Sequence, residues 1–344
     1  MSDLVGVVDL ALKCAAAAVA IRIVRSDTAL QWAAAAVAVL VVVPQTLALL
    51  RSQYLRSARR RMAAATGAKA RASVAEFAAA LEGKNSNSKE KGKGEGGEDD
   101  EQQRASFTLG PIGAVASRAR RSRSDAMSLL TDVLHRTVRS NRQLNCVTTF
   151  VKPLEALQGE VDDLFSGGGG GSSRRKAGGQ QQPPGMLHGL PVSIKECFKI
   201  AGQDTTIGVA KKCGLPSADD AVIVKVLRRQ GAIVFARTNI PQTMLSYECG
   251  NPIYGTTLNP YDLQRSPGGS SGGEGALIGS HGSILGVGTD IGGSCRIPAA
   301  YSGCCGFKPT AGRLSGVGAV PGTPGQEGVK STAGPMVKYE DMKT

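Results

Sequence analysis

The stretch Ser266–Thr310 reads SPGGSSGGEGALIGSHGSILGVGTDIGGSCRIPAAYSGCCGFKPT and places two serines, Ser270 and Ser294, in separate glycine-flanked turns. Glycine has no Cβ, so such turns allow positive φ angles and let backbone N–H groups approach a ligand closely. The run TDIGGS, which ends at Ser294, can point successive N–H groups at one oxygen atom and stabilise an oxyanion. The stretch therefore predicts the loops of an acyl-transfer site; the alternative is a pair of glycine-rich loops that serve only as tight turns.

A serine hydroxyl needs a base before it can act as a nucleophile, and histidine is the usual choice. The three histidines of the chain, His135, His188 and His281, do not stand in a sequence context typical of a catalytic triad. Lys195 is the better candidate, because it comes near the end of the apolar run LPVSIKE, where a strand is expected to finish. A buried lysine loses its proton more readily and can act as a base near neutral pH, whereas a lysine that reaches into water stays protonated.

Three motifs in this order resemble the amidase signature family of serine hydrolases: PVSIKE around Lys195, SPGGSSGGEGALIG around Ser270 and GTDIGGS around Ser294. They are most similar to the fatty acid amide hydrolase branch, and the separations of 75 and 24 residues between the three side chains agree with that branch. The resemblance runs from about Ser124 to Met336. It implies an α/β fold with a mixed central β-sheet covered by helices, a class that the alternating helix and strand patterns after Ser124 also favour.

The resemblance further implies a Ser–Ser–Lys triad. Neutral Lys195 would accept a proton that Ser270 relays from Ser294, and Ser294 would attack the acyl carbon to form an acyl-enzyme that water then hydrolyses. The peptide bond Gly269–Ser270 would be cis, and Ser271 would support the relay by hydrogen bonding. The substrate-binding residues that it implies are Met244, Ser270, Ile291, Gly292, Gly293 and Ser294, the last four through backbone N–H groups around the oxyanion. For Met244, taken by itself, the alternative is packing in the core.

The N-terminal segment Ala29–Leu50 (ALQWAAAAVAVLVVVPQTLALL) carries no charged residue and is long enough for one membrane-spanning helix, the alternative being a buried or interfacial helix. A cluster of arginines follows it: Arg51, Arg56, Arg59, Arg60 and Arg61. Positive charge beside a span favours the cytoplasmic side and attracts anionic lipid headgroups. We therefore expect residues 1–61 to be a single-pass anchor with a basic flank, with the catalytic part in the cytoplasm on an endomembrane.

Residues 62–123 are expected to form a linker. Within it, Gly83–Arg104 is polar, charged and rich in glycine, so it predicts a flexible tether. Residues 124–344 correspond to the N-terminal part of an amidase signature domain, with a low-complexity insert at 166–185 that predicts a surface loop. The resemblance implies further strands and helices after the GPM of Gly334–Met336, so an incomplete domain is expected.

The overall charge of +13 raises nucleic-acid binding as an alternative, with Arg118–Arg123 (RARRSR) as its best argument. Aromatic residues make up only 4% of the chain and no nucleic-acid-binding motif accompanies the basic run, so this class is not favoured. The eight cysteines lack CxxC pairs and metal-ligand spacing, which indicates free thiols in a reducing compartment. No metal or cofactor is expected.

Together these features predict a membrane-anchored serine hydrolase that cleaves the amide bond of fatty acid amides. Its partners would be a fatty acyl amide or a related small amide and membrane lipids, and nucleic acid would not be among them. Two alternatives stay open: a soluble amidase or transamidation subunit of the same family, and a truncated, catalytically inert membrane protein. The oligomeric state is also open, with a homodimer among the alternatives.

Overall fold

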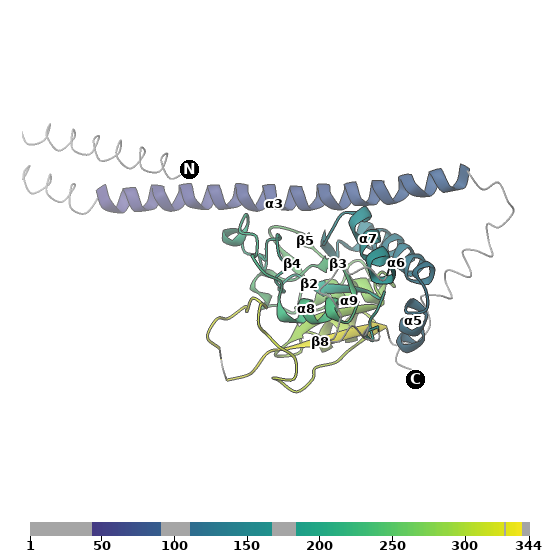
Figure 1. Ribbon diagram of the computed structural model, residues 1–344. Helices are drawn as coiled ribbons and strands as arrows, with labels where there is room; N and C mark the ends of the chain where they lie inside the picture. Colours follow the sequence, from purple (N-terminus) through teal and green to yellow (C-terminus); the bar gives the residue numbers. More distant parts are fainter. Residues whose placement is uncertain (1–42, 91–110, 167–183, 327, 339–344) are drawn as a thin grey trace, which may run out of the picture. The chain divides into compact units, whose positions relative to one another are not determined.

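In the computed structural model, the described residues contain a six-stranded mixed sheet (Figure 1). Its strands are β1 (Val147–Phe150), β2 (Pro191–Lys195), β3 (Ile233–Thr238), β6 (Leu285–Asp290), β7 (Cys304–Gly306) and β8 (Thr332–Lys338), in the spatial order β1-β3-β2-β6-β8-β7. β2 runs parallel to both of its neighbours, β3 and β6. The other pairs are antiparallel: β1 with β3, β8 with β6, and β7 with β8. The mixed α/β class predicted from the sequence is confirmed.

The structure describes residues 43–90, 111–166, 184–326 and 328–338. The chain divides into two units, Met1–Met62 and Ala63–Thr344, and all that follows concerns the second. Of the predicted membrane span Ala29–Leu50, positions 29–42 lie outside the described residues. In the part of the chain that is described, no helix has both the length and the apolar character needed to cross a membrane.

Helices cover both faces of the sheet, which accounts for the complete burial of β2 and β3. The described helices are α3 (Val43–Glu90), α5 (Ile112–Ala119), α6 (Arg123–Leu144), α7 (Leu154–Phe165), α8 (Val222–Arg229), α9 (Gly272–Gly279) and α10 (Arg296–Tyr301), with short 3₁₀ turns η2 (Ala210–Lys212) and η3 (Gln242–Met244) and a small ribbon of β4 (Gly250–Asn251) and β5 (Gly255–Thr256). Along β3, Ile233 and Phe235 face the core beneath α6, α7 and α9, while Val234 faces the core beneath α8. This alternation is the two-residue period of a strand.

The region predicted to be a linker is partly helical and partly buried. In the second unit, α3 places Phe77, Ala78 and Leu81 in the core beneath α6, and the Phe77 ring stacks on Phe150 with 3.8 Å between ring centroids. The reason is that apolar residues recur at helical spacing on this segment, so one face can be buried. α3 also continues to Glu90, into the stretch expected to be a tether. The rest of that stretch to position 104 and most of the predicted insert at 166–185 lie outside the described residues.

Candidate active site

Lys195 ends β2 and its side chain is fully buried. Its Nζ donates hydrogen bonds to Ser270 Oγ at 2.7 Å and to Thr289 Oγ1 at 2.8 Å. Burial lowers the pKa of Lys195, against the opposing influence of nearby thiols and of Asp290. Lys195 stands at a strand end, as expected, and of the two alternatives left open by the sequence the structure shows the buried one. The lowered pKa increases the fraction of neutral amine that can act as a base.

The sheet order explains why these groups meet. β2 and β6 are parallel neighbours, so their carboxyl ends lie at the same edge of the sheet, and Thr289 is near the end of β6. Ser270 belongs to neither strand: it lies in the loop before α9, two residues before the first helical residue, Gly272. A ligand site outside the carboxyl ends of parallel strands is the usual arrangement in α/β folds.

Buried cysteines surround the lysine and contribute to its apolar setting. Electrostatic interaction links Lys195 with Cys197, Cys249 and Cys295. Burial raises the pKa of Cys197 and Cys249 to about 11 and that of Cys295 to about 12. All three thiols are therefore neutral near pH 7, and Cys295, although it follows Ser294, lacks the thiolate character of a nucleophile.

The two serine loops are tied together through Ser271. The peptide bond Gly269–Ser270 is cis, as the family resemblance implies. The N–H of Ser271 donates to the Ser294 carbonyl at 3.0 Å, and its hydroxyl donates to the Thr289 carbonyl at 3.3 Å. Ser270 and Ser294 thus lie on adjoining loops, with exposed fractions of 2% and 7%, so that Ser294 is the more accessible of the two.

Of the two side-chain contacts that the relay implied by the resemblance would need, the structure contains one. The Lys195–Ser270 hydrogen bond is formed. In the described part of the chain, no hydrogen bond joins the hydroxyls of Ser270 and Ser294. Catalytic hydrogen bonds in structures without substrate are often long and shorten when the complex forms. The N–H of Gly293, one of the four amides implied for the oxyanion, donates here to Asp290 Oδ1 at 2.8 Å.

Asp290 organises the loop that carries Ser294. Its fully buried carboxylate accepts hydrogen bonds from the backbone N–H groups of Gly293, Cys295 and Arg296. The Arg296 guanidinium adds two more, each at 3.0 Å. Burial would raise the pKa of Asp290, but the Arg296 side chain and the three backbone donors together lower it to about 2. Asp290 and Arg296 therefore fix the turn that carries Ser294.

Replacing Asp290 by asparagine is expected to lower the free energy of unfolding by about 2 kcal/mol at neutral pH. The folded-state pKa is depressed, so this stabilisation is complete above the ordinary value of 3.8 and is lost as the pH falls through about 2. Thermal melting of both proteins at decreasing pH should show the difference shrinking below pH 3.8. The exposed Asp219→Asn is the control, and an equal difference at neutral pH and at the acid end would contradict this account.

The segment Ser246–Glu248 runs along the site, and sequence reasoning named none of its three residues as a site residue. A Cβ on Gly269 would lie 2.6 Å from the carbonyl oxygens of both Ser246 and Glu248, so this segment packs on the loop just before Ser270. A Cβ on Gly292 would meet only the Tyr247 hydroxyl, at 3.9 Å, within 4 Å. Tyr247 therefore stands near the open space beside the loop of Ser294 and is a candidate substrate contact.

Met244 is less clearly a site residue. It has a positive φ of 60° in the turn before Leu245, and its partly buried side chain packs against the core that contains Val192 and Ile194. The core-packing alternative for Met244 thus has a direct contact in its favour. Leu245, next to it, is 67% exposed.

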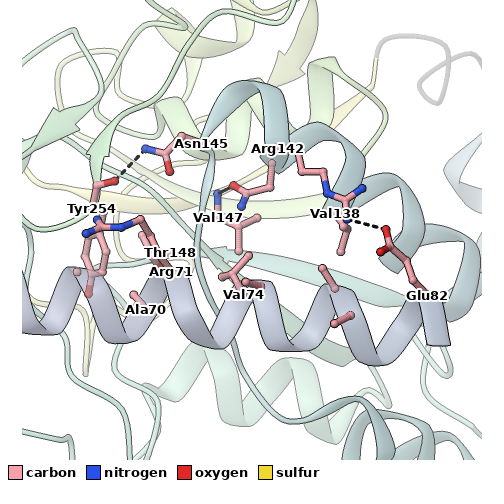
Figure 2. A pocket seen from close by; sticks show the side chains of 15 residues that line it. Ala70, Arg71, Val74, Glu82, Val138, Arg142, Asn145, Val147, Thr148 and Tyr254 are labelled. Atoms are coloured by element: carbon pink, nitrogen blue, oxygen red, sulfur yellow. Dashed lines mark hydrogen bonds and ion pairs between the residues drawn. The ribbon is translucent and has the colours of Figure 1, made fainter. Parts of the chain in front are cut away.

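A separate hollow of about 300 Å³ lies between α3, α6 and β1 (Figure 2). Small residues of α3, such as Ala70 and Val74, form one wall, and the Asn145 amide donates to the Tyr254 carbonyl at 2.9 Å beside it. An ion pair between Arg142 and Glu82, with 2.6 Å between nitrogen and oxygen, lies at its other end. The catalytic candidates are not among the residues that line this hollow, so it is distinct from the site described above.

Comparison with known proteins places the chain in a family. The family described as "Amidase" matches residues 128–341. "Fatty-acid amide hydrolase 1" of Sus scrofa is 41% identical over 228 residues, which cover 66% of this chain and 36% of that protein. "Vitamin D3 hydroxylase-associated protein" of Gallus gallus is 40% identical over 214 residues, which cover 62% of this chain and 42% of that protein.

The structural comparison agrees. A solved structure of "Fatty acid amide hydrolase" superposes with a TM-score of 0.61 at 32% identity, covering 68% of this chain and 39% of that one. The chain thus spans less than half the length of these relatives. With the family match, the matched fold and the two serine loops beside a buried lysine, the chain belongs to the amidase signature family and is related to fatty acid amide hydrolase.

Proposed function

We propose that this chain is a serine hydrolase that cleaves the amide bond of fatty acid amides, with Lys195, Ser270 and Ser294 as its catalytic triad. The observation that carries the proposal is the 2.7 Å hydrogen bond between the fully buried Lys195 amine and Ser270. Burying an amine is costly unless it is well bonded, and a lysine kept partly neutral in this way is suited to proton transfer. The similarity to amide-hydrolysing relatives supports the reaction class.

In the proposed reaction, neutral Lys195 takes a proton from Ser270, and Ser270 takes one from Ser294 as the Ser294 Oγ attacks the acyl carbon. The backbone N–H groups of Ile291, Gly292 and Ser294 stabilise the oxyanion, since that of Gly293 is held by Asp290. The amide C–N bond breaks as the same proton returns through Ser270 to the leaving amine. Water then attacks the acyl-enzyme by the same relay and releases the fatty acid.

The fatty acyl substrate and the membrane are finer parts of this proposal. Exposed apolar side chains beside the site, Leu245 and Tyr247, are suited to contact a hydrocarbon chain. We propose further that Ala29–Leu50 attaches the protein to an endomembrane by a single pass, with the catalytic part in the cytoplasm and the arginines after it against anionic headgroups. The homodimer stays a prediction.

The decisive test is labelling of the purified chain with a fluorophosphonate probe, which phosphonylates reactive serines. We expect labelling of the wild type, none of Ser294→Ala, and undiminished labelling of the control Ser315→Ala, an exposed serine in another loop. A parallel trial should show faster hydrolysis of fatty acyl amides than of short amides or glutamine. The reverse preference would favour the soluble amidase or transamidation alternative, and an unlabelled wild type would favour the inert one.

A further inference from the structure

Glu274 is a fully buried carboxyl group that the proposed mechanism does not use. It lies in the first turn of α9, four residues after Ser270. A buried carboxyl group is expensive unless its oxygens are hydrogen-bonded, so its presence beside the site needs a reason. Its hydrogen-bond partners supply one.

The two carboxyl oxygens of Glu274 accept hydrogen bonds from β2, the strand that ends at Lys195, and from its neighbour β3. Ser193 Oγ donates to Glu274 Oε2 at 2.6 Å, and Thr238 Oγ1 donates to Oε1 at 2.8 Å. Ser193 precedes Lys195 by two residues on β2, so the two side chains share a face of the sheet. Thr238 is the β3 residue paired with Lys195. Glu274 therefore binds the sheet at two positions next to Lys195, one on its own strand and one on the neighbouring strand.

A third strand leaves room for this carboxyl group. On β6, Gly286 is paired with Ser193, and a Cβ on Gly286 would lie only 2.0 Å from Glu274 Oε2. The hydroxyls of Ser193 and Ser283 are also joined, at 2.9 Å. Three neighbouring strands thus surround one carboxyl group: Ser193 of β2 and Thr238 of β3 each donate a hydrogen bond to it, and Gly286 of β6 leaves room for it.

We propose that Glu274 is a positioning residue that locks the helix following Ser270 onto the strand that ends at Lys195, and so keeps the lysine amine within hydrogen-bond reach of Ser270. The inference rests on the function proposed above. It follows from connectivity: Ser270 is joined to Glu274 by one short turn, and Lys195 to Ser193 by two residues of strand. Fixing Glu274 to Ser193 fixes the lysine and the serine to each other.

The charge of Glu274 bears on the lysine as well. Burial raises the pKa of Glu274 to about 7, although hydrogen bonds from Ser193 and Thr238 and the charge of Lys195 oppose the rise. The other titratable groups near it are the thiols of Cys146 and Cys304, whose pKa values burial also raises, so they are neutral near pH 7. Glu274 therefore gains or loses its charge in the range where the proposed base must be neutral, and a negative Glu274 favours the protonated lysine.

The test compares Glu274→Gln with Glu274→Ala in the full chain. Glutamine has the same shape; its amide group can donate to Ser193, whose hydroxyl can donate instead to the Leu285 carbonyl. The fluorophosphonate labelling rate should be measured from about pH 5 to about pH 9. The titration of the Lys195 side chain should be followed by NMR, with the Lys195 signal assigned by its loss in Lys195→Arg. Glu160→Gln, a change at a carboxylate on α7 that pairs with Lys152, is the matched control.

Glu274→Ala is expected to reduce the labelling rate at least about tenfold, because the lysine and serine lose their common support. Glu274→Gln should restore labelling to near the wild-type rate at the alkaline end. It should also move the acid limb of the profile, and the titration of Lys195, to lower pH by about half a unit or more, because a negative charge has been removed. Glu160→Gln should reproduce the wild type throughout.

If Glu274→Gln only lowers the melting temperature, while its labelling profile and Lys195 titration coincide with those of the wild type, Glu274 is a structural residue and the inference fails. If Glu274→Ala does not fold, the glutamine variant decides alone. If the wild type is not labelled at all, the proposed function fails, but the Lys195 titration still answers: a shift in Glu274→Gln supports the coupling, and an unchanged titration overturns it.

Discussion

Lys195→Met should abolish the reactivity of Ser294 and at the same time make the protein more stable below alkaline pH. Loss of a general base removes about 10²-fold to 10⁴-fold of rate, so fluorophosphonate labelling should fall by at least the lower figure. Stability should rise because methionine fills a similar volume without an amine to desolvate. The variant leaves the hydroxyls of Ser270 and Thr289 without the lysine, which offsets part of that gain.

The stability gain has a defined pH dependence. The folded-state pKa of Lys195 is lowered, so between that value and the ordinary 10.5 the unfolded chain binds a proton that the folded chain does not. The wild type therefore gains stability as the pH rises through this window, at about 1.4 kcal/mol per pH unit. The advantage of Lys195→Met should be largest at and below the folded-state pKa and should shrink toward 10.5.

Melting temperatures of the two proteins across this range test the prediction. Lys199→Met is the matched control, because Lys199 follows the same strand by four residues but is exposed. It should change neither labelling nor the pH dependence of melting. A stability advantage of Lys195→Met that is the same at every pH would show that the pKa of Lys195 is not lowered in the folded protein. Labelling of Ser294 that survives in Lys195→Met would show that Lys195 is not the base.

Gly273→Ala should be among the most damaging single substitutions in the chain. A Cβ there would lie 2.3 Å from the backbone nitrogen and 2.5 Å from the carbonyl oxygen of Asn239, and 2.8 Å from the Cys146 carbonyl oxygen. These atoms cannot rotate away, because Gly273 and Asn239 are themselves joined by a hydrogen bond of 3.0 Å between N–H and carbonyl. We expect a loss of roughly 3 kcal/mol of unfolding free energy, the upper end for overpacking.

The same substitution should also remove labelling of Ser294. α9 must move away from β3 to admit the methyl group, and Ser270 moves with it, because Ser270 stands just before the helix. In a solvent-exposed helix, alanine in place of glycine would stabilise the protein by about 1 kcal/mol. A loss of stability in Gly273→Ala would therefore come from the close packing and not from helix propensity. Gly316→Ala is the control, because nothing lies within 4 Å of its Cβ position. Wild-type melting and labelling of Gly273→Ala would contradict the close approach of α9 to the sheet.

The parts of the site carried by contiguous motifs were predictable from the sequence. The strand ending at Lys195, the cis bond before Ser270 and the turn around Ser294 follow from local residue patterns or from the family resemblance they support. The relations among strands were not predictable, because β2 lies between β3 and β6, which come later in the chain. Thr289 and Glu274 owe their contacts with Lys195 and Ser193 to that order, and no local pattern encodes it.

The packing of α3 within the predicted linker could not be read from the sequence for a related reason. The segment around Phe77 is rich in alanine and charged residues, a composition that does not distinguish a solvated helix from one that packs on a domain. Only the partner surface decides, and the partner Phe150 is 73 residues further on. The segment Ser246–Glu248 was missed because its role depends on close backbone approach to Gly269, which residue types do not reveal.

The hydrogen bonds of Lys195 also set an order of events in folding. Its partners Ser270 and Thr289 lie 75 and 94 residues further along the chain, so the amine finds them only after long loops have closed. Contacts of such large sequence separation slow folding and form late. Until then, the Lys195 amine is without these two partners. On the proposed mechanism, the reactivity of Ser294 would therefore report completion of the sheet, because Lys195 meets Ser270 only after the long loop between them has closed.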